Sequence, residues 1–203
     1  MAASVIVERN GLAVRIVKLA SRAFLSPFFK INVRGIDNIP VKGSFVLLPK
    51  HQRWEDIPLI AISIERPLYY VAKQELFDNF LSKRLIEMLG GLPMNRSQPA
   101  RSRYTLASVI KKLGEGEGLV IFPEGTYYRN RMGPGQSGLI RMIHTNIRTL
   151  FLPAGIKYRN DNRKKSVCIT FGKPFDSNVF NTSKELLAYA MSEISRLSGI
   201  SKL

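Results

Sequence analysis

The chain has 203 residues, of which 45% are hydrophobic and 9% are aromatic, so it is long enough for one folded domain and is not intrinsically disordered. Thirty-one Lys and Arg against fifteen Asp and Glu give a formal charge of +16, which favours a polyanionic partner: nucleic acid, an anionic lipid surface, or an acidic carrier with phosphate-bearing substrates. The single cysteine, Cys168, excludes an intramolecular disulfide and favours a reducing, cytosol-facing location.

The first thirty residues carry an amphipathic pattern. Residues 5–25 have helical spacing with a basic side and an apolar side, and the aromatic residues Phe24, Phe28 and Phe29 extend the apolar part. This pattern is typical of a helix that lies flat on an anionic membrane, and the alternative is an ordinary surface helix. We therefore predict a membrane-contacting helix at residues 1–30 and one folded domain at residues 31–203. No uncharged apolar run of about 18 residues occurs, so no transmembrane helix is expected, and acidic and basic residues interrupt any secretory signal.

After Pro27, segments with the periodicity of strands alternate with segments that have helical spacing. The expected strands are Ile31–Arg34, Phe45–Leu48, Leu68–Ala72, Gly118–Phe122, Leu150–Tyr158 and Val167–Phe171. The expected helices are Ile57–Ile64, Gln74–Leu89, residues 101–113, Ser137–Ile147 and Lys184–Leu197, the last capped by Thr182 or Ser183. This alternation predicts an α/β fold: a single domain with a mixed, largely buried sheet flanked by helices and preceded by the amphipathic helix.

His51 directly follows a predicted strand, and loops at the carboxyl ends of strands are where α/β sheets bind ligands. Asp56 lies five positions later, and the two side chains can meet only if His51 precedes the helix and Asp56 lies in its first turn. Pro58 favours a helix start at this point. The pair then predicts a general base, with Asp56 accepting a hydrogen bond from one imidazole nitrogen. The alternative for Asp56 is a simple helix cap.

Two further loops carry polar groups. Phe122-Pro-Glu-Gly-Thr126 follows a short apolar strand, where Glu124, Gly125 and Thr126 can shape a substrate site, although such a string is also typical of a turn. Gly90-Gly-Leu-Pro-Met-Asn-Arg96 ends in an arginine that follows a possible short strand. The planar guanidinium of Arg96 suits a phosphate, and a solvated surface arginine is the alternative.

Four stretches in this order and spacing resemble the motifs of the glycerolipid acyltransferase family, which includes the 1-acylglycerol-3-phosphate acyltransferases. The resemblance covers about residues 31–175 and rests on His51–Asp56, Gly91–Arg96, Phe122–Thr126 and Leu152–Ile156. The sequence departs from the family where Lys50 replaces the usual Asn and Tyr127-Tyr128 replaces the usual Arg-Ser; Gln136 takes the place of a common basic residue. These changes leave the chemistry intact and bear on the choice of acceptor.

The resemblance implies that His51 takes a proton from an acceptor hydroxyl while Asp56 holds the imidazole in the required tautomer. The hydroxyl oxygen then attacks a thioester of coenzyme A or acyl carrier protein, which is a co-substrate, so no cofactor is expected. The implied acceptor is a lysophospholipid such as 1-acylglycerol-3-phosphate, in phospholipid biosynthesis. Lys73 and Arg96 are the candidates for its phosphate, and Glu124, Gly125 and Thr126 for its site.

On this interpretation residues 31–203 form the acyltransferase domain. The protein is then expected at the cytoplasmic face of the membrane, as a peripheral or monotopic protein. Two separated histidines and one cysteine form no zinc pattern, so no metal is expected. Three alternatives remain: an enzyme of the same fold for another alcohol or amine, an inactive lipid-binding relative, and a basic nucleic-acid-binding protein. The charge supports the last, but no nucleic-acid-binding motif occurs, so no nucleic acid is expected.

Overall fold

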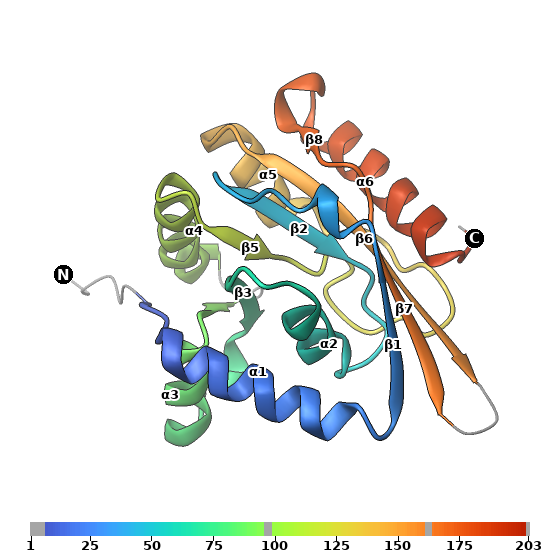
Figure 1. Ribbon diagram of the computed structural model, residues 1–203. Coiled ribbons are helices and arrows are strands. Elements are labelled where there is room, and N and C mark those ends of the chain that lie inside the picture. Colours follow the sequence, from blue (N-terminus) through green and yellow to red (C-terminus); the bar gives the residue numbers. More distant parts are fainter. Residues whose placement is uncertain (1–6, 96–98, 161–163, 202–203) are drawn as a thin grey trace.

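A mixed sheet forms the centre of the protein, whose computed structural model describes residues 7–95, 99–160 and 164–201 (Figure 1). Over these residues the sheet has eight strands in the order β1-β7-β6-β2-β5-β3-β4, with β8 paired to β6. They are β1 (Phe29–Arg34), β2 (Phe45–Pro49), β3 (Leu68–Lys73), β4 (Gly91–Met94), β5 (Gly118–Val120), β6 (Leu150–Asn160), β7 (Lys165–Phe171) and β8 (Phe175–Asp176).

Parallel pairing dominates the sheet, and β6 supplies the antiparallel part. β2 runs parallel to both of its neighbours, β5 and β6, and all five of its residues are buried, as expected for a continuous apolar run. β6 forms antiparallel pairs with β7 and β8. The prediction of a single α/β domain with a mixed, largely buried sheet is therefore confirmed.

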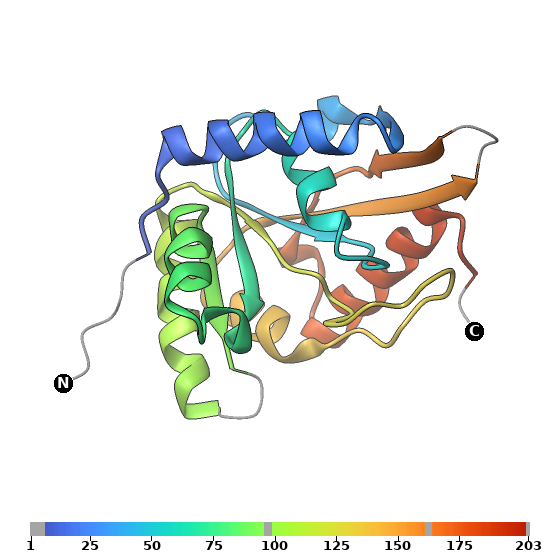
Figure 2. The same cartoon turned by 90° about the horizontal axis from the view of Figure 1, so that it is seen from below.

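Helices cover both faces of the sheet. They are α1 (Gly11–Leu25), α2 (Asp56–Ser63), α3 (Phe80–Met88), α4 (Pro99–Gly114), α5 (Ser137–Asn146) and α6 (Ser183–Ser198). Figure 2 shows α1 and α2 on one side of the sheet and α5 and α6 on the other. Two buried apolar clusters correspond to these layers: one includes Leu25 of α1 and Leu59 of α2, and the other includes Ile143 of α5 and Ile194 of α6.

Asn79 interrupts the helix that the sequence predicted over residues 74–89. Its backbone is extended, and its side-chain oxygen accepts a hydrogen bond from the backbone N–H of Leu81, so it caps a new helix. The segment therefore consists of a 3₁₀ turn at Gln74–Phe77 followed by α3. The expected cap of the last helix is confirmed, because the Thr182 hydroxyl accepts a hydrogen bond from the N–H of Glu185.

Helix α1 begins at Gly11, six residues later than the periodicity predicts; the first two residues of the predicted helix lie outside the described residues. Two of its cations face the domain. Lys18 Nζ donates a 2.6 Å hydrogen bond to the carbonyl of Ile64, and Arg22 donates one to the carbonyl of Ile62. Both carbonyls lie at the C-terminal end of α2, where cations are stabilised by the helix dipole. These bonds attach α1 to the domain by its basic side.

Candidate active site

The side chains of His51 and Asp56 meet at the carboxyl edge of the sheet. β2 ends at Pro49 and α2 begins at Asp56, so His51 precedes the helix and Asp56 lies in its first turn. Nδ1 of His51 is 3.1 Å from Oδ2 of Asp56. Asp56 is fully buried and the His51 side chain is 10% exposed. The arrangement leaves Nε2 of His51 as the nitrogen that can take a proton from a bound hydroxyl.

Asp56 also organises the loop that carries the histidine. Its Oδ2 accepts hydrogen bonds from the backbone N–H groups of Gln52 and Arg53, so it caps the segment before α2 as well as contacting the imidazole. Its Oδ1 accepts a 2.6 Å hydrogen bond from the hydroxyl of Tyr158 on β6. Burial raises the pKa of Tyr158, and the charge of Asp56 raises it further, so this hydroxyl remains a donor. The carboxylate of Asp56 therefore does both things that the sequence suggested: it caps the segment before α2, and it contacts Nδ1 of His51.

Two aromatic rings fix the plane of the imidazole. Phe122 stacks on His51 with ring centroids 3.8 Å apart, and Tyr127 meets the imidazole edge-on at 4.5 Å. Burial raises the pKa of Tyr127, with smaller contributions from Asp56 and Glu55. In the sequence, Tyr127 is only a departure from the pattern of the family that the chain resembles. In the structure it lies against the proposed base.

A buried ion pair lies beside this loop. Nζ of Lys50 is 2.6 Å from Oε2 and 2.8 Å from Oε1 of Glu124, and both side chains are 0% exposed. Oε2 also accepts a hydrogen bond from the backbone N–H of His51, and Oε1 accepts one from Gly133. Burial lowers the pKa of Lys50, an effect that its contacts with Glu124 oppose. With both oxygens occupied by protein donors, this position favours an indirect role for Glu124 over the predicted substrate contact.

A cavity of about 950 Å³ opens at the histidine. His51, Lys73, Gly125 and Thr126 all line it, so the structure brings four of the predicted site residues to one cavity. Apolar side chains of α1, α2, β3 and α3 make up much of the remaining wall, among them Val14, Val17, Ala61, Leu68, Ile86 and Leu89. Arg96, the second predicted phosphate ligand, lies outside the described residues. Over the part of the chain that the structure describes, His, Cys, Asp and Glu form no group suited to a metal ion.

Comparison with known proteins identifies the family. The family model described as Acyltransferase matches residues 30–157, which is most of the chain and includes His51, Asp56 and Glu124. The chain belongs to the Acyltransferase family.

Curated relatives agree with this assignment. The 1-acyl-sn-glycerol-3-phosphate acyltransferase of Bacillus subtilis is 32% identical over 108 residues, which are 53% of this chain and 53% of that protein. The protein of the same name from Pseudomonas aeruginosa is 36% identical over 111 residues, 54% of this chain and 40% of the relative. The chain thus spans about half the length, or less, of the curated relatives it matches.

A solved structure has the same fold. The 1-acyl-sn-glycerophosphate acyltransferase PlsC of Thermotoga maritima superposes with a TM-score of 0.75 at 24% identity, covering 92% of this chain and 78% of that one. The likeness extends beyond the family match at residues 30–157, so it takes in elements on both sides of that segment.

Proposed function

We propose that this Acyltransferase domain moves a fatty acyl group onto the hydroxyl of a lysophospholipid of the 1-acylglycerol-3-phosphate type. One observation carries the proposal: a His51–Asp56 pair at 3.1 Å stands at the wall of a large, mainly apolar cavity in a chain of this family. The names of the curated relatives from Bacillus subtilis and Pseudomonas aeruginosa support this choice of acceptor.

His51 is the general base of the proposed reaction. Nε2 takes the proton of the acceptor hydroxyl as its oxygen attacks the thioester carbonyl, while Asp56 and Tyr158 hold Nδ1 as the donor. Collapse of the tetrahedral intermediate breaks the carbon–sulfur bond, and the thiol leaves with the proton. The acyl group passes directly to the acceptor, so no acyl-enzyme is required. The donor is acyl-coenzyme A or acylated acyl carrier protein.

The cavity offers separate environments for the two ends of a lipid. Lys73 is exposed at the end of β3 and lines the cavity, where its ammonium group can meet the acceptor phosphate. The apolar walls contributed by α1, α2 and α3 suit a hydrocarbon chain. Gly125 and Thr126 line the cavity next to His51 and shape the place of the reacting hydroxyl.

The surface of α1 supports the proposed association with an anionic membrane. Leu12, Ile16 and Leu19 are 68%, 58% and 71% exposed, whereas Lys18 and Arg22 bind carbonyls of the domain. The helix therefore turns its apolar side outward, which is the orientation that buries apolar area in a bilayer. Among the described residues, no helix is long and apolar enough to cross a membrane.

An acceptor panel tests the proposal. Purified protein in anionic liposomes is given labelled acyl-coenzyme A or labelled acyl-acyl carrier protein. Each assay contains one acceptor: 1-acylglycerol-3-phosphate, another lysophospholipid, monoacylglycerol or an amine. Acylation of 1-acylglycerol-3-phosphate above the other acceptors is the expected result. Acylation of a different alcohol or of an amine would contradict the proposed acceptor. Salt-sensitive binding of RNA without any acyl transfer would contradict the proposed enzyme class.

A further inference from the structure

The Lys50–Glu124 ion pair joins the two loops that form the site. Glu124 belongs to the loop after β5, and Lys50 directly follows β2. Besides Glu124, Nζ of Lys50 donates to the carbonyls of Tyr128 at 2.9 Å and His51 at 3.2 Å. The N–H of Tyr128 donates to the carbonyl of His51. The backbone of His51 is therefore held on both its N–H and its C=O side by groups tied to this pair.

The pair also balances charge next to the imidazole. The groups that face His51 come from several elements: Asp56 from α2, with Tyr158 of β6 bonded to it, and Tyr127 from the loop after β5. Glu55 and Arg53 lie in the turn before α2, and the guanidinium of Arg53 stacks on Tyr158. Lys50 and Glu124 add one positive and one negative charge, both removed from solvent. Buried charges act on their neighbours with little screening.

We propose that Lys50 and Glu124 are positioning residues. Their buried ion pair fixes the backbone of His51, and the Lys50 ammonium cancels the charge of the Glu124 carboxylate next to the imidazole. Asp56 is then the carboxylate that orients the imidazole. The kinetic consequences rest on the proposed acyl transfer; the charge relationship does not.

Single substitutions at Lys50 and at Glu124 are expected to move the titration midpoint of His51 in opposite directions. Lys50→Met leaves the Glu124 carboxylate with two backbone N–H donors and no cation, and a negative charge at this position favours the protonated imidazole. The titration midpoint of His51 should rise by about 0.5–1 pH unit. Glu124→Gln leaves the Lys50 cation with two carbonyl acceptors, so the midpoint should fall by about the same amount. The double variant, Lys50→Met with Glu124→Gln, should return close to the wild-type midpoint.

The titration can be read directly, because the chain has only two histidines. Proton–carbon NMR of the full chain in detergent reports both imidazoles, and His144→Gln assigns them. His144 serves as an internal reference, since its Nε2 contacts the carbonyl of Ser177, away from the pair. Its midpoint should not move in any of the variants. This readout needs no turnover, so displaced midpoints without any acyl transfer would contradict the proposed function and still support the pair.

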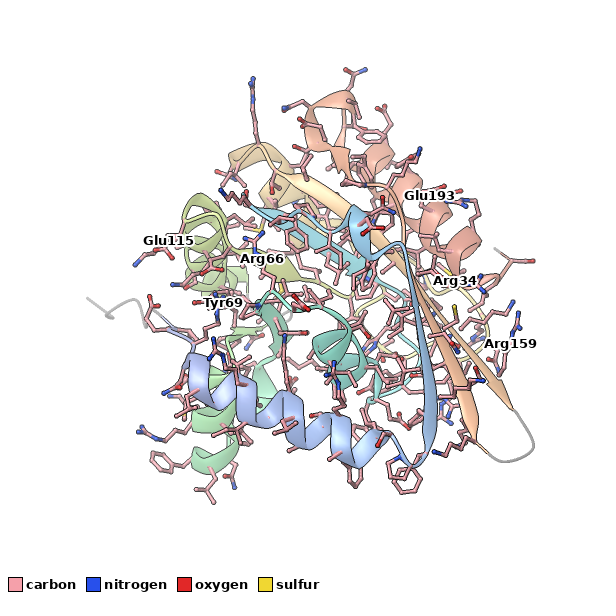
Figure 3. The ribbon with its side chains drawn as sticks, in the orientation of Figure 1. Arg34, Arg66, Tyr69, Glu115, Arg159 and Glu193 are labelled. Carbon is pink, nitrogen blue, oxygen red and sulfur yellow. The ribbon has the colours of Figure 1, made fainter. Side chains whose placement is uncertain are left out.

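A matched control is the ion pair of Arg9 and Glu117, two 3.0 Å contacts at the opposite edge of the sheet. Glu117 precedes β5, whereas Glu124 follows it. The guanidinium of Arg9 lies over Tyr69, which Figure 3 labels on the side of the molecule opposite Arg159. Glu117→Gln should lower the melting temperature while leaving the His51 midpoint and kcat unchanged.

Kinetics provide the second readout. In the double variant no charge is left unpaired, so the chain should fold, and kcat should fall about tenfold with KM within about twofold of wild type because His51 is less firmly placed. If either single variant does not fold, the kcat of the double variant tests the proposed role of the ion pair. Unmoved midpoints in both single variants, displacements in the same direction, or wild-type kcat in the double variant would overturn the proposal.

Discussion

The hydroxyl of Tyr158 donates a 2.6 Å hydrogen bond to the one oxygen of Asp56 that does not face His51. The carboxylate is thereby held from both sides, by β6 on Oδ1 and by the histidine loop on Oδ2. This contact turns a pair of residues that are close in sequence into a three-residue chain across the sheet.

Tyr158→Phe should reduce kcat about tenfold and lower the free energy of unfolding by about 1–3 kcal/mol, because a buried carboxylate oxygen loses a donor. Steady-state kinetics and urea unfolding measure the two effects. Tyr189→Phe is the matched control, since Tyr189 is 44% exposed on α6 and packs against Phe175. Equal kcat values for Tyr158→Phe and wild type would show that Asp56 needs no support from β6.

Asp56→Asn should lower kcat by a factor of about 10²–10⁴ with little change in KM, because the amide can present the wrong group to Nδ1 and stabilise the wrong tautomer. The fold is checked by circular dichroism, since Asp56 also accepts two backbone hydrogen bonds. Glu55→Gln changes the neighbouring carboxyl, which makes no side-chain cap bond, and should retain most activity. A larger loss of kcat in Glu55→Gln than in Asp56→Asn would show that Glu55, and not Asp56, orients His51.

Lys73→Ala should raise KM for 1-acylglycerol-3-phosphate severalfold and leave KM for monoacylglycerol, which has no phosphate, unchanged. Arg96→Ala is expected to behave in the same way, because both cations are assigned to the acceptor phosphate. The comparison of the two acceptors separates loss of phosphate binding from general damage. Equal effects on both acceptors would remove Lys73 and Arg96 from that role.

Replacing Leu12 and Leu19 together by Gln should weaken binding to anionic liposomes at least about tenfold, because each leucine contributes about 1.5–3 kcal/mol when it leaves water. Liposome sedimentation measures the change. Val179→Gln is the control: Val179 is 69% exposed and lies beside β8, which Figure 1 shows on the side of the molecule away from α1. Undiminished sedimentation of the leucine variant would reject α1 as the membrane contact.

Much of the fold followed from periodicity. The apolar run at Phe45–Leu48 predicted the buried strand β2, and the spacing from His51 to Pro58 permitted His51 and Asp56 to meet at a helix start, as they do in the structure. These predictions succeeded because the signals are local. The break at Asn79 was missed because the apolar spacing continues across it, and only the capping bond to Leu81 reveals the new start.

The remaining site contacts depend on distant parts of the chain. Tyr158 lies 102 positions from Asp56, and Glu124 lies 74 positions from Lys50, so neither contact leaves a local pattern. The orientation of α1 could not be predicted for the same reason. The sequence shows its basic side and its apolar side, but Lys18 binds a backbone carbonyl at the end of another helix, and such a partner leaves no sequence signal. In the sequence, Lys50 is only a lysine that directly follows the apolar run Phe45–Pro49, and the resemblance to the family marked it only as a departure.

The most direct test of the account is acyl transfer by His51→Ala. Wild type and variant, at equal concentration in liposomes, are incubated with 1-acylglycerol-3-phosphate and either labelled acyl-coenzyme A or labelled acyl-acyl carrier protein. Circular dichroism verifies that both proteins are folded. Wild type should form the diacyl product, and the variant should be slower by a factor of about 10²–10⁴ or more, because the general base is absent. A folded His51→Ala protein that retains most of the wild-type rate would contradict the central claim.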